Sequence, residues 1–351
     1  MSAITIDGDL VHYEKLGRGR PVILVHGWIG SWRYWIPLMS KLHTSFSVYT
    51  LDLIGFGDSS KTEANYTVAA QVRMLEKFTD QLGIPKVALI GHGLGAMVAT
   101  QFALKNPTKT VRMMLTSMPL FDPGDLSERT PAGTRKMLTG NRSRHSLAPQ
   151  LEDDGATNNA VTLPNARSHS SDGSLYTPFH ELPTINRPNE IDRDALRRAA
   201  EERDKAKNRP NPLNDAFKGA TITSLLEKTF KRNEPEFDKL KTDVDKSDNK
   251  VLEKSAEGYS AADMLDDLRR ITSPVLAIHG MADPIIPNPS EEIWNYLTLE
   301  KEDIFVPIPL PNVRHFPMLE HEAYSQLAVD FLNTADISKI EVRERWKRRN
   351  R

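Results

Sequence analysis

The ten residues KVALIGHGLG, at positions 86–95, decide the fold of this chain. Their first five form an apolar run of the length of a buried strand, and residues 94–105 have the composition of a helix. Between strand and helix, Gly91 and Gly95 occupy the glycine positions of the pattern G-x-S-x-G, in which a serine nucleophile stands on a sharp turn. The central position of this pattern is Gly93, so the attacking hydroxyl is missing.

Four further motifs lie around this turn at intervals that suit alternating strands and helices. One apolar run ends in His26-Gly27, and another leads into residues 52–59, which match D-x-x-G-x-G-x-S. Late in the chain, the apolar run 275–280 precedes Asp283, and His315 follows the last such run. Strand-like runs that alternate with amphipathic helical ones predict a mostly parallel sheet flanked by helices.

In this order, the five motifs resemble those of the α/β-hydrolase superfamily, most closely its ester-hydrolase and epoxide-hydrolase-like members. The resemblance covers roughly residues 1–118 and 260–335. It implies an α/β-hydrolase fold with an inserted helical cap. It also implies that Asp283 is the acid and His315 the base of the active site.

The same resemblance predicts the remaining site residues. The oxyanion hole is expected at the backbone N–H groups of Trp28 and Leu94. The pocket residues expected around it are His26, Gly27, His92 and Trp32. Two interpretations stay open for the aromatic residues that follow Gly27: a pocket wall, or packing under the cap. A histidine in a turn usually bonds locally, so His26 is expected to brace its loop rather than to catalyse.

The chain divides into four predicted parts. The first part of the core is residues 1–118, and its second part is residues 261–335. Between them, residues 119–260 form a cap insertion with a long polar loop at about 122–189 and helices after it. One charged helix is predicted at 191–207, and the apolar residues from Leu213 to Phe230 predict a second helix. Residues 336–351 form a basic tail.

Composition excludes several function classes. The 351 residues include 46 Lys and Arg against 47 Asp and Glu, a net charge of −1, so bulk charge favours no nucleic-acid partner. No cysteine is present, which excludes disulfides, thiol nucleophiles and cysteine metal sites. No metal site, cofactor, signal peptide or transmembrane segment is expected, and the default prediction is a cytoplasmic protein.

Gly93 leaves three hypotheses for function. A glycine cannot form an acyl intermediate, so the first is a catalytically degenerate pseudoenzyme that binds a ligand or a protein. The second is an enzyme in which Asp283 and His315 act as a dyad, with His315 as general base on water or substrate. The third is an esterase whose serine has been replaced, so that Gly93→Ser regains activity.

A different class of protein also fits part of the turn. Gly91, Gly93 and Ala96 match G-x-G-x-x-A, the fingerprint of dinucleotide-binding proteins. That fingerprint normally opens the first strand–helix unit and needs an acidic residue about 20 positions later, where this chain has Leu115, Thr116 and Ser117 instead. The hydrolase motifs are therefore the better explanation.

The expected partners follow from the same pattern. A small apolar ligand is a candidate for the pocket. A protein partner is a candidate for residues 122–189, which are too poor in apolar residues to fold alone, or for the basic tail.

Overall fold

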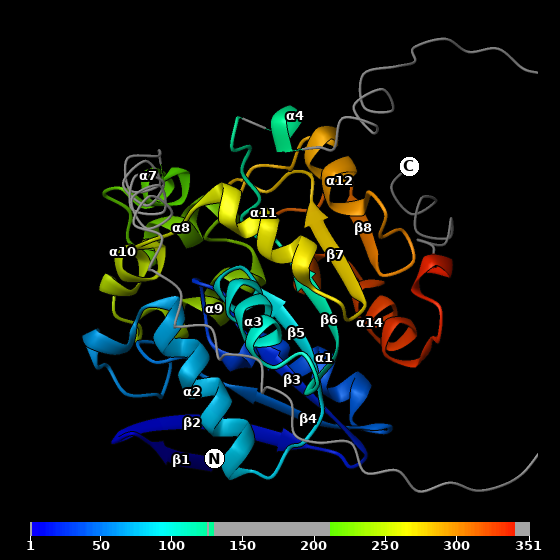
Figure 1. Cartoon of the computed structure of the whole chain (residues 1–351). Helices are drawn as coiled ribbons and strands as arrows, with labels where there is room; N and C mark the ends of the chain where they lie inside the picture. The colour runs from blue at the N-terminus through cyan, green and yellow to red at the C-terminus, as the bar shows by residue number, and fades with distance from the viewer. Residues whose placement is uncertain (1, 125, 130–210, 341–351) are drawn as a thin grey trace, which may run out of the picture. The chain divides into compact units, whose positions relative to one another are not determined.

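The apolar runs form the strands of one sheet, and the predicted motifs lie at the ends of these strands. The structure, a computed structural model, describes residues 2–124, 126–129 and 211–340, and these residues form a single sheet of eight strands (Figure 1). The strand order is β1-β2-β4-β3-β5-β6-β7-β8. The strands are β1 (Ser2–Ile6), β2 (Asp9–Leu16), β3 (Arg20–Val25), β4 (Phe46–Leu51), β5 (Val87–His92), β6 (Thr110–Thr116), β7 (Val275–Gly280) and β8 (Phe305–Leu310).

The sheet is parallel except at one edge. β1 and β2 form an antiparallel hairpin, and β2 pairs antiparallel with β4. All other pairs, from β4 to β8, are parallel. Every residue of β4, β5 and β7 is buried, which is why these strands read as continuous apolar runs rather than as alternating ones.

Helices cover both faces of the sheet. The chain runs from β3 to β4 in one direction across the sheet and from β4 through β5 to β8 in the other. Because such crossovers are right-handed, this reversal places α1 on the opposite face from α2, α3, α11 and α12. The helices are α1 (Ile36–Leu42), α2 (Val68–Gln81), α3 (Leu94–Lys105), α11 (Ala261–Arg270), α12 (Glu291–Thr298) and α14 (Tyr324–Asn333).

Four further helices precede α11, and they correct one expectation from the sequence. They are α7 (Pro212–Phe217), α8 (Ile222–Thr229), α9 (Pro235–Val244) and α10 (Lys250–Ala256). The apolar residues from Leu213 to Phe230 suggest a single helix, but the structure has two. The break occurs because Thr221 starts a new helix, where its side chain and that of Ser224 form a capping box.

Helices α7 to α10 lie over the carboxyl ends of the strands, near the predicted site (Figure 1). Their side chains reach the loops after β3 and β8: Ser255 bonds Trp28, and Phe230 packs on Phe316. All described residues belong to one unit, formed by 1–138 and 206–351, so the separation of a cap from a core stays a prediction. Most of the polar loop, the helix predicted at 191–207 and most of the basic tail lie outside the described residues.

The remaining described elements are short. They are α4 (Leu126–Arg129), α13 (Pro317–Glu320) and the 3-10 turns Trp32–Trp35, Glu63–Asn65 and Ile337–Lys339. In the parts of the chain that the structure covers, no helix has the length and apolar character needed to cross a membrane.

Candidate active site

The turn between β5 and α3 has the strained backbone of an elbow. Gly93 stands at its apex with φ 51° and ψ −111°, and its N–H donates to the carbonyl of Thr116 at 2.9 Å. A residue with a Cβ adopts this conformation only at a cost of about 1–3 kcal/mol, which glycine avoids. Gly95 is required for a different reason: a Cβ there would lie 2.2 Å from the carbonyl oxygen of Val25.

The indole of Trp28 covers Gly93. A Cβ built on Gly93 would lie 3.0 Å from both Cε3 and Cζ3 of Trp28, closer than an ordinary carbon–carbon contact of about 3.5–4.0 Å. The indole is fully buried and contacts α10 and α7. Its Nε1 donates to Ser255 Oγ of α10 at 2.9 Å, and Phe217 of α7 packs edge-on at 5.0 Å. The indole therefore occupies space into which a side chain at position 93 would extend.

The predicted acid and base form a buried pair. His315 Nδ1 donates to Asp283 Oδ2 at 2.8 Å, and both side chains are inaccessible to solvent. Burial acts to raise the pKa of the Asp283 carboxyl, but the charge and hydrogen bond of His315, with the N–H of Ile285, hold that pKa below its usual range. Asp283 is therefore an ionised acceptor. In the described part of the chain, His315 Nε2 is buried and has no hydrogen-bond partner.

A relay of hydrogen bonds ties the elbow to the loops on both sides of it. Gly27 N–H donates to Tyr34 Oη at 2.6 Å, and Tyr34 Oη lies 3.0 Å from His92 Nδ1. His92 Nε2 donates to the carbonyl of His315 at 2.8 Å, and Ser117 Oγ donates to the same carbonyl at 3.1 Å. Burial, and then the proximity of His315, hold the pKa of His92 well below its ordinary value. His92 is thus a neutral structural link between Tyr34 and the carbonyl of His315.

The expected oxyanion donors have free N–H groups. Leu94 is the first residue of α3, so its N–H has no partner within the helix. Among the described residues, no hydrogen bond is found from the N–H of Trp28 or of Leu94. The assignment of these two groups to an oxyanion hole remains a prediction.

The contacts of His26 and Trp32 are with residues other than Asp283 and His315. His26 donates from Nδ1 to the carbonyl of Gly27 at 2.8 Å and accepts at Nε2 from Leu53 N–H at 2.9 Å, so it braces two loops. Burial lowers its pKa and keeps it neutral. The ring of Trp32 packs against His12 with centroids 5.7 Å apart. Of the two interpretations of Trp32, these contacts favour packing over a pocket wall.

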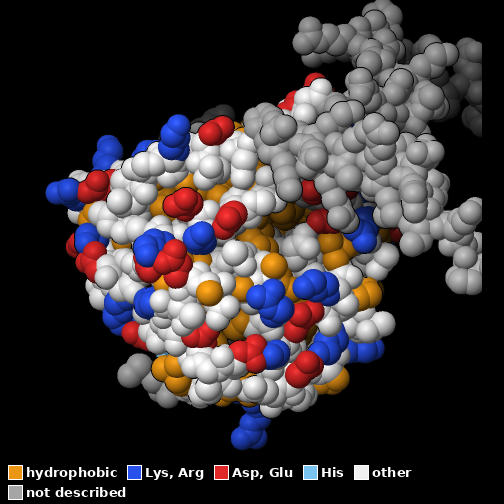
Figure 2. Space-filling view, turned by 60° about the vertical axis from the view of Figure 1, so that its left-hand side comes forward, with side chains coloured by type: hydrophobic (Ala, Val, Ile, Leu, Met, Phe, Trp, Pro, Cys, Tyr) orange, Lys and Arg blue, Asp and Glu red, His pale blue; other side chains and the backbone are white. Residues whose placement is uncertain are grey.

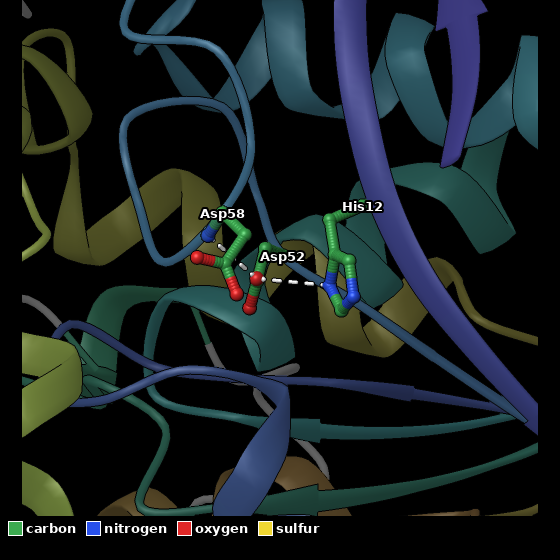
Figure 3. Close-up of side chains that lie close together, drawn as sticks. All are labelled: His12, Asp52 and Asp58. Carbon is green, nitrogen blue, oxygen red and sulfur yellow. Dashed lines mark hydrogen bonds and ion pairs between the residues drawn. The ribbon is translucent and has the colours of Figure 1, made fainter. Parts of the chain in front are cut away.

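A buried carboxylate organises the loop of residues 52–59. Asp52 Oδ1 accepts from Trp32 N–H at 2.9 Å. Its Oδ2 accepts from Asp58 N–H at 2.9 Å and from His12 Nδ1 at 3.2 Å (Figure 3). Burial acts to raise the pKa of the Asp52 carboxyl, but these donors and nearby His26 hold it below its usual range. Asp52 therefore acts as a brace between β2, β4 and the aromatic segment after β3.

His12, Asp52 and Asp58 are close enough together to be considered as metal ligands. However, the Asp52 oxygens already accept three donors, and Asp58 is paired with Arg33 at 3.0 Å and with Lys246 at 2.7 Å. Arg33 and Lys246 thus already balance the charge of Asp58, which a metal ion would otherwise do. The cluster is accounted for as a structural network.

The His12–Asp52 pair makes stability depend on pH. The hydrogen bond to Asp52 is the largest effect on the pKa of His12 and raises it above 6.5, although burial opposes it. A raised pKa stabilises the fold below the unfolded-state pKa, and this contribution is lost as pH rises through the folded-state value. We expect His12→Gln to lose on the order of 1 kcal/mol more stability at pH 5.5 than at pH 9. Urea unfolding of both proteins at the two pH values measures this difference, and an equal loss at both would contradict it.

One clamp near the site was not found from the sequence. Arg314, next to His315, pairs with Glu234, the N-cap residue of α9, at 3.0 Å and with Glu320 at 2.9 Å. Its guanidinium lies over the ring of Phe230 at 4.6 Å. It therefore links the segment between α8 and α9 to the loop that carries His315. No sequence pattern links Arg314 to Glu234, because the two are 80 residues apart and meet only in the fold.

The fold and the order of these loops define an α/β-hydrolase scaffold, and comparison with known proteins agrees. The model of the family described as alpha/beta hydrolase fold matches residues 20–322. The chain belongs to this family. An esterase from Thermogutta terrifontis superimposes with a TM-score of 0.57 over 95% of this chain and 98% of its own, at 20% identity. An enol-lactonase from Burkholderia xenovorans LB400 gives 0.59 over 95% and 100%, at 15% identity. These likenesses show the fold alone.

Curated relatives match over shorter stretches. A soluble epoxide hydrolase from Corynebacterium sp. (strain C12) is 34% identical over 113 residues, 32% of this chain and 40% of the relative. A (lyso)-N-acylphosphatidylethanolamine lipase from Bos taurus is 35% identical over 99 residues, 27% of this chain and 29% of the relative. The chain thus spans well under half the length of these relatives.

Proposed function

We propose that this protein is a binding member of the α/β-hydrolase family that does not carry out serine-type covalent hydrolysis. The observation that carries the proposal is Gly93, a residue without a side chain at the apex of the elbow. The predicted acid and base, Asp283 and His315, are hydrogen-bonded to each other, so the proposal concerns the nucleophile alone. Hydrolysis of esters or epoxides, which the names of the relatives suggest, is the activity that this chain would have lost.

The surroundings of Gly93 support the proposal. The space that a serine side chain would need lies against the indole of Trp28, and the inserted helices fix that indole through Ser255 and Phe217. A nucleophile needs room for its own hydroxyl and for the substrate carbonyl beside it. Here both His315 and Trp28 are fully buried. Packing of this kind supports the loss of covalent hydrolysis at position 93.

A second candidate function is hydrolysis through the Asp283–His315 dyad, without a covalent step. It is favoured by one observation: His315 Nε2 is buried, unpartnered and backed by an ionised carboxylate. Such a nitrogen can accept a proton from water or from a substrate. In this function His315 would be the general base and Asp283 the residue that orients it.

Steady-state and burst kinetics on a panel of short p-nitrophenyl esters separate the two functions. We expect the protein to release no burst of p-nitrophenol, because a burst requires an acyl-enzyme, and to show no turnover above that of His315→Ala. Turnover without a burst that disappears in His315→Ala and persists in Gly93→Ala would establish the dyad mechanism instead. A burst that His315→Ala abolishes would overturn both.

The partners and location of the protein are proposals of the same kind. A small apolar ligand is proposed for the predicted pocket around His26, Gly27, His92 and Trp32. A protein partner is proposed for residues 122–189 or the basic tail. A cytoplasmic location and the lack of a cofactor stay predictions from composition.

A further inference from the structure

A cavity lies on the flank of the molecule, on the face of the sheet that carries α2, α3 and α11. We name it the flank cavity. Its volume is about 260 Å³, and it is bordered by the first turns of α2, the outer side of α3, α11 and the segment after α10. Its apolar lining includes the buried side chains of Val72, Met97 and Met264. Figure 2 brings the side of the molecule that carries α2 toward the viewer, where apolar side chains are visible between charged ones.

The charged groups of the flank cavity are mainly acidic. Asp263 and Asp267 lie four residues apart on α11, Glu257 follows α10, and Lys105 ends α3. The lining therefore carries three carboxylates and one ammonium group, and Glu257 is already paired with Lys254 at 3.5 Å. Residues four apart lie on the same side of a helix, so the two aspartates present their charges to the same space.

Asp267 is the most enclosed of these acids, with a side chain that is 18% exposed. Gln101 Nε2 donates to its Oδ2, and the exposed guanidinium of Arg270 lies 3.3 Å from its Oδ1. Even so, its pKa is raised: burial is the main cause, and the charges of Asp263 and Asp266 add to it, while Gln101 and Arg270 act in the opposite direction. Gln101 and Arg270 thus offset only part of the effect of burial on the Asp267 carboxylate.

We propose that the flank cavity binds a small organic cation, a primary ammonium group on a short apolar chain, with the ammonium at Asp267 and Asp263 and the chain against Val72, Met97 and Met264. The proposal deepens the binding function proposed above and rests on it. A volume of about 260 Å³ is just below the roughly 300–1,000 Å³ of sites for drug-sized ligands, so it suits a ligand of fragment size.

Two other ligand classes fit less well. An anion would meet three carboxylates and only Lys105. A metal ion needs ligand atoms that converge, and among the described residues the acids of the flank cavity do not come close enough together to be considered as metal ligands. An apolar chain with a single positive end uses both the apolar lining and the separated acids.

The flank cavity also adjoins the site at the elbow. Ser255 lines it, and the same Ser255 accepts the hydrogen bond from Trp28 Nε1 at 2.9 Å. Met97 lines it one turn after Gly93 on α3. A ligand there would therefore touch residues that hold the indole over Gly93, and near-ultraviolet circular dichroism of the tryptophans provides a second readout.

Isothermal titration calorimetry with n-hexylamine at pH 8 tests the proposal. A primary amine is protonated at this pH, since the ordinary pKa of a lysine amine is about 10.4. We expect one saturable site, a Kd for n-hexylamine at least about tenfold below those for 1-hexanol and hexanoate, and a loss of at least about tenfold in Asp267→Asn. The matched control Lys105→Gln, which removes the single cation, should bind n-hexylamine as tightly as the parent or more tightly.

The opposite results overturn the proposal. Equal binding of n-hexylamine and 1-hexanol would show that no charge is recognised. Unchanged binding in both Asp267→Asn and the exposed Asp263→Asn would place the amine elsewhere, and the second variant keeps the test valid if the first does not fold. Ester turnover is measured separately, so a protein that fails to bind the amine but shows no turnover refutes this inference and leaves the proposed function standing.

Discussion

Gly93→Ser alone is expected to gain little esterase activity, whereas Gly93→Ser combined with Trp28→Leu is expected to exceed it by on the order of 10²-fold in kcat/KM. Serine at this position carries a Cβ that would stand 3.0 Å from two carbons of the indole, and its hydroxyl extends further. The φ of 51° adds about 1–3 kcal/mol of strain. Leucine at position 28 removes the indole and retains the backbone N–H. The backbone donors of an oxyanion hole supply about 10²–10³ in rate on their own.

The matched control for this pair is Gly93→Ala with Trp28→Leu. It has the same backbone strain and the same opened space but no hydroxyl, so it should stay inactive. Equal activity of the alanine and serine double variants would show that the hydrolysis does not pass through position 93. Full activity in Gly93→Ser alone would show that the indole moves aside for the serine side chain. The serine would then restore activity without a second substitution.

Asp52→Ala is expected to destabilise the fold by about 3–5 kcal/mol, the cost of breaking a buried charged pair. The variant removes the acceptor of His12 and leaves the N–H groups of Trp32 and Asp58 without a partner in a buried loop. Urea unfolding monitored by tryptophan fluorescence measures the loss, with the midpoint and slope both compared with the parent.

Asp58→Ala is the control for this prediction. Its carboxylate is 28% exposed and pairs with Arg33 and Lys246 on the surface, where such pairs contribute about 1 kcal/mol or less. The N–H of position 58 is retained, so Asp52 keeps its acceptor role. Losses of similar size in the two variants would contradict the view that Asp52 is the centre of this loop.

The fold could be predicted because its turn chemistry is local. The glycines around Gly93, the His26-Gly27 turn and the loop of Asp52 each occupy a few consecutive residues, so their pattern and order are visible in the chain. The same holds for α3, whose bounds of Leu94–Lys105 agree with the predicted helix. The α/β-hydrolase fold predicted from these motifs is confirmed by the sheet and by the family match.

What the sequence could not supply depends on contacts between distant segments. Trp28 was expected to contribute its backbone N–H, but nothing in the chain indicates that its ring packs over Gly93, because Ser255, 227 residues away, fixes that ring. Trp32 stands four residues after Trp28 in the same aromatic segment, yet it packs on His12. The helix α10 was not expected at all, since its seven residues carry too few apolar positions to show a period.

Labelling with a fluorophosphonate, read by intact-protein mass spectrometry, tests the central claim most directly. We expect no adduct on the protein, and an adduct at position 93 in the variant with Gly93→Ser and Trp28→Leu. An adduct on any serine of the unaltered protein that disappears in His315→Ala would contradict it, because that serine would then be the nucleophile which Gly93 does not provide.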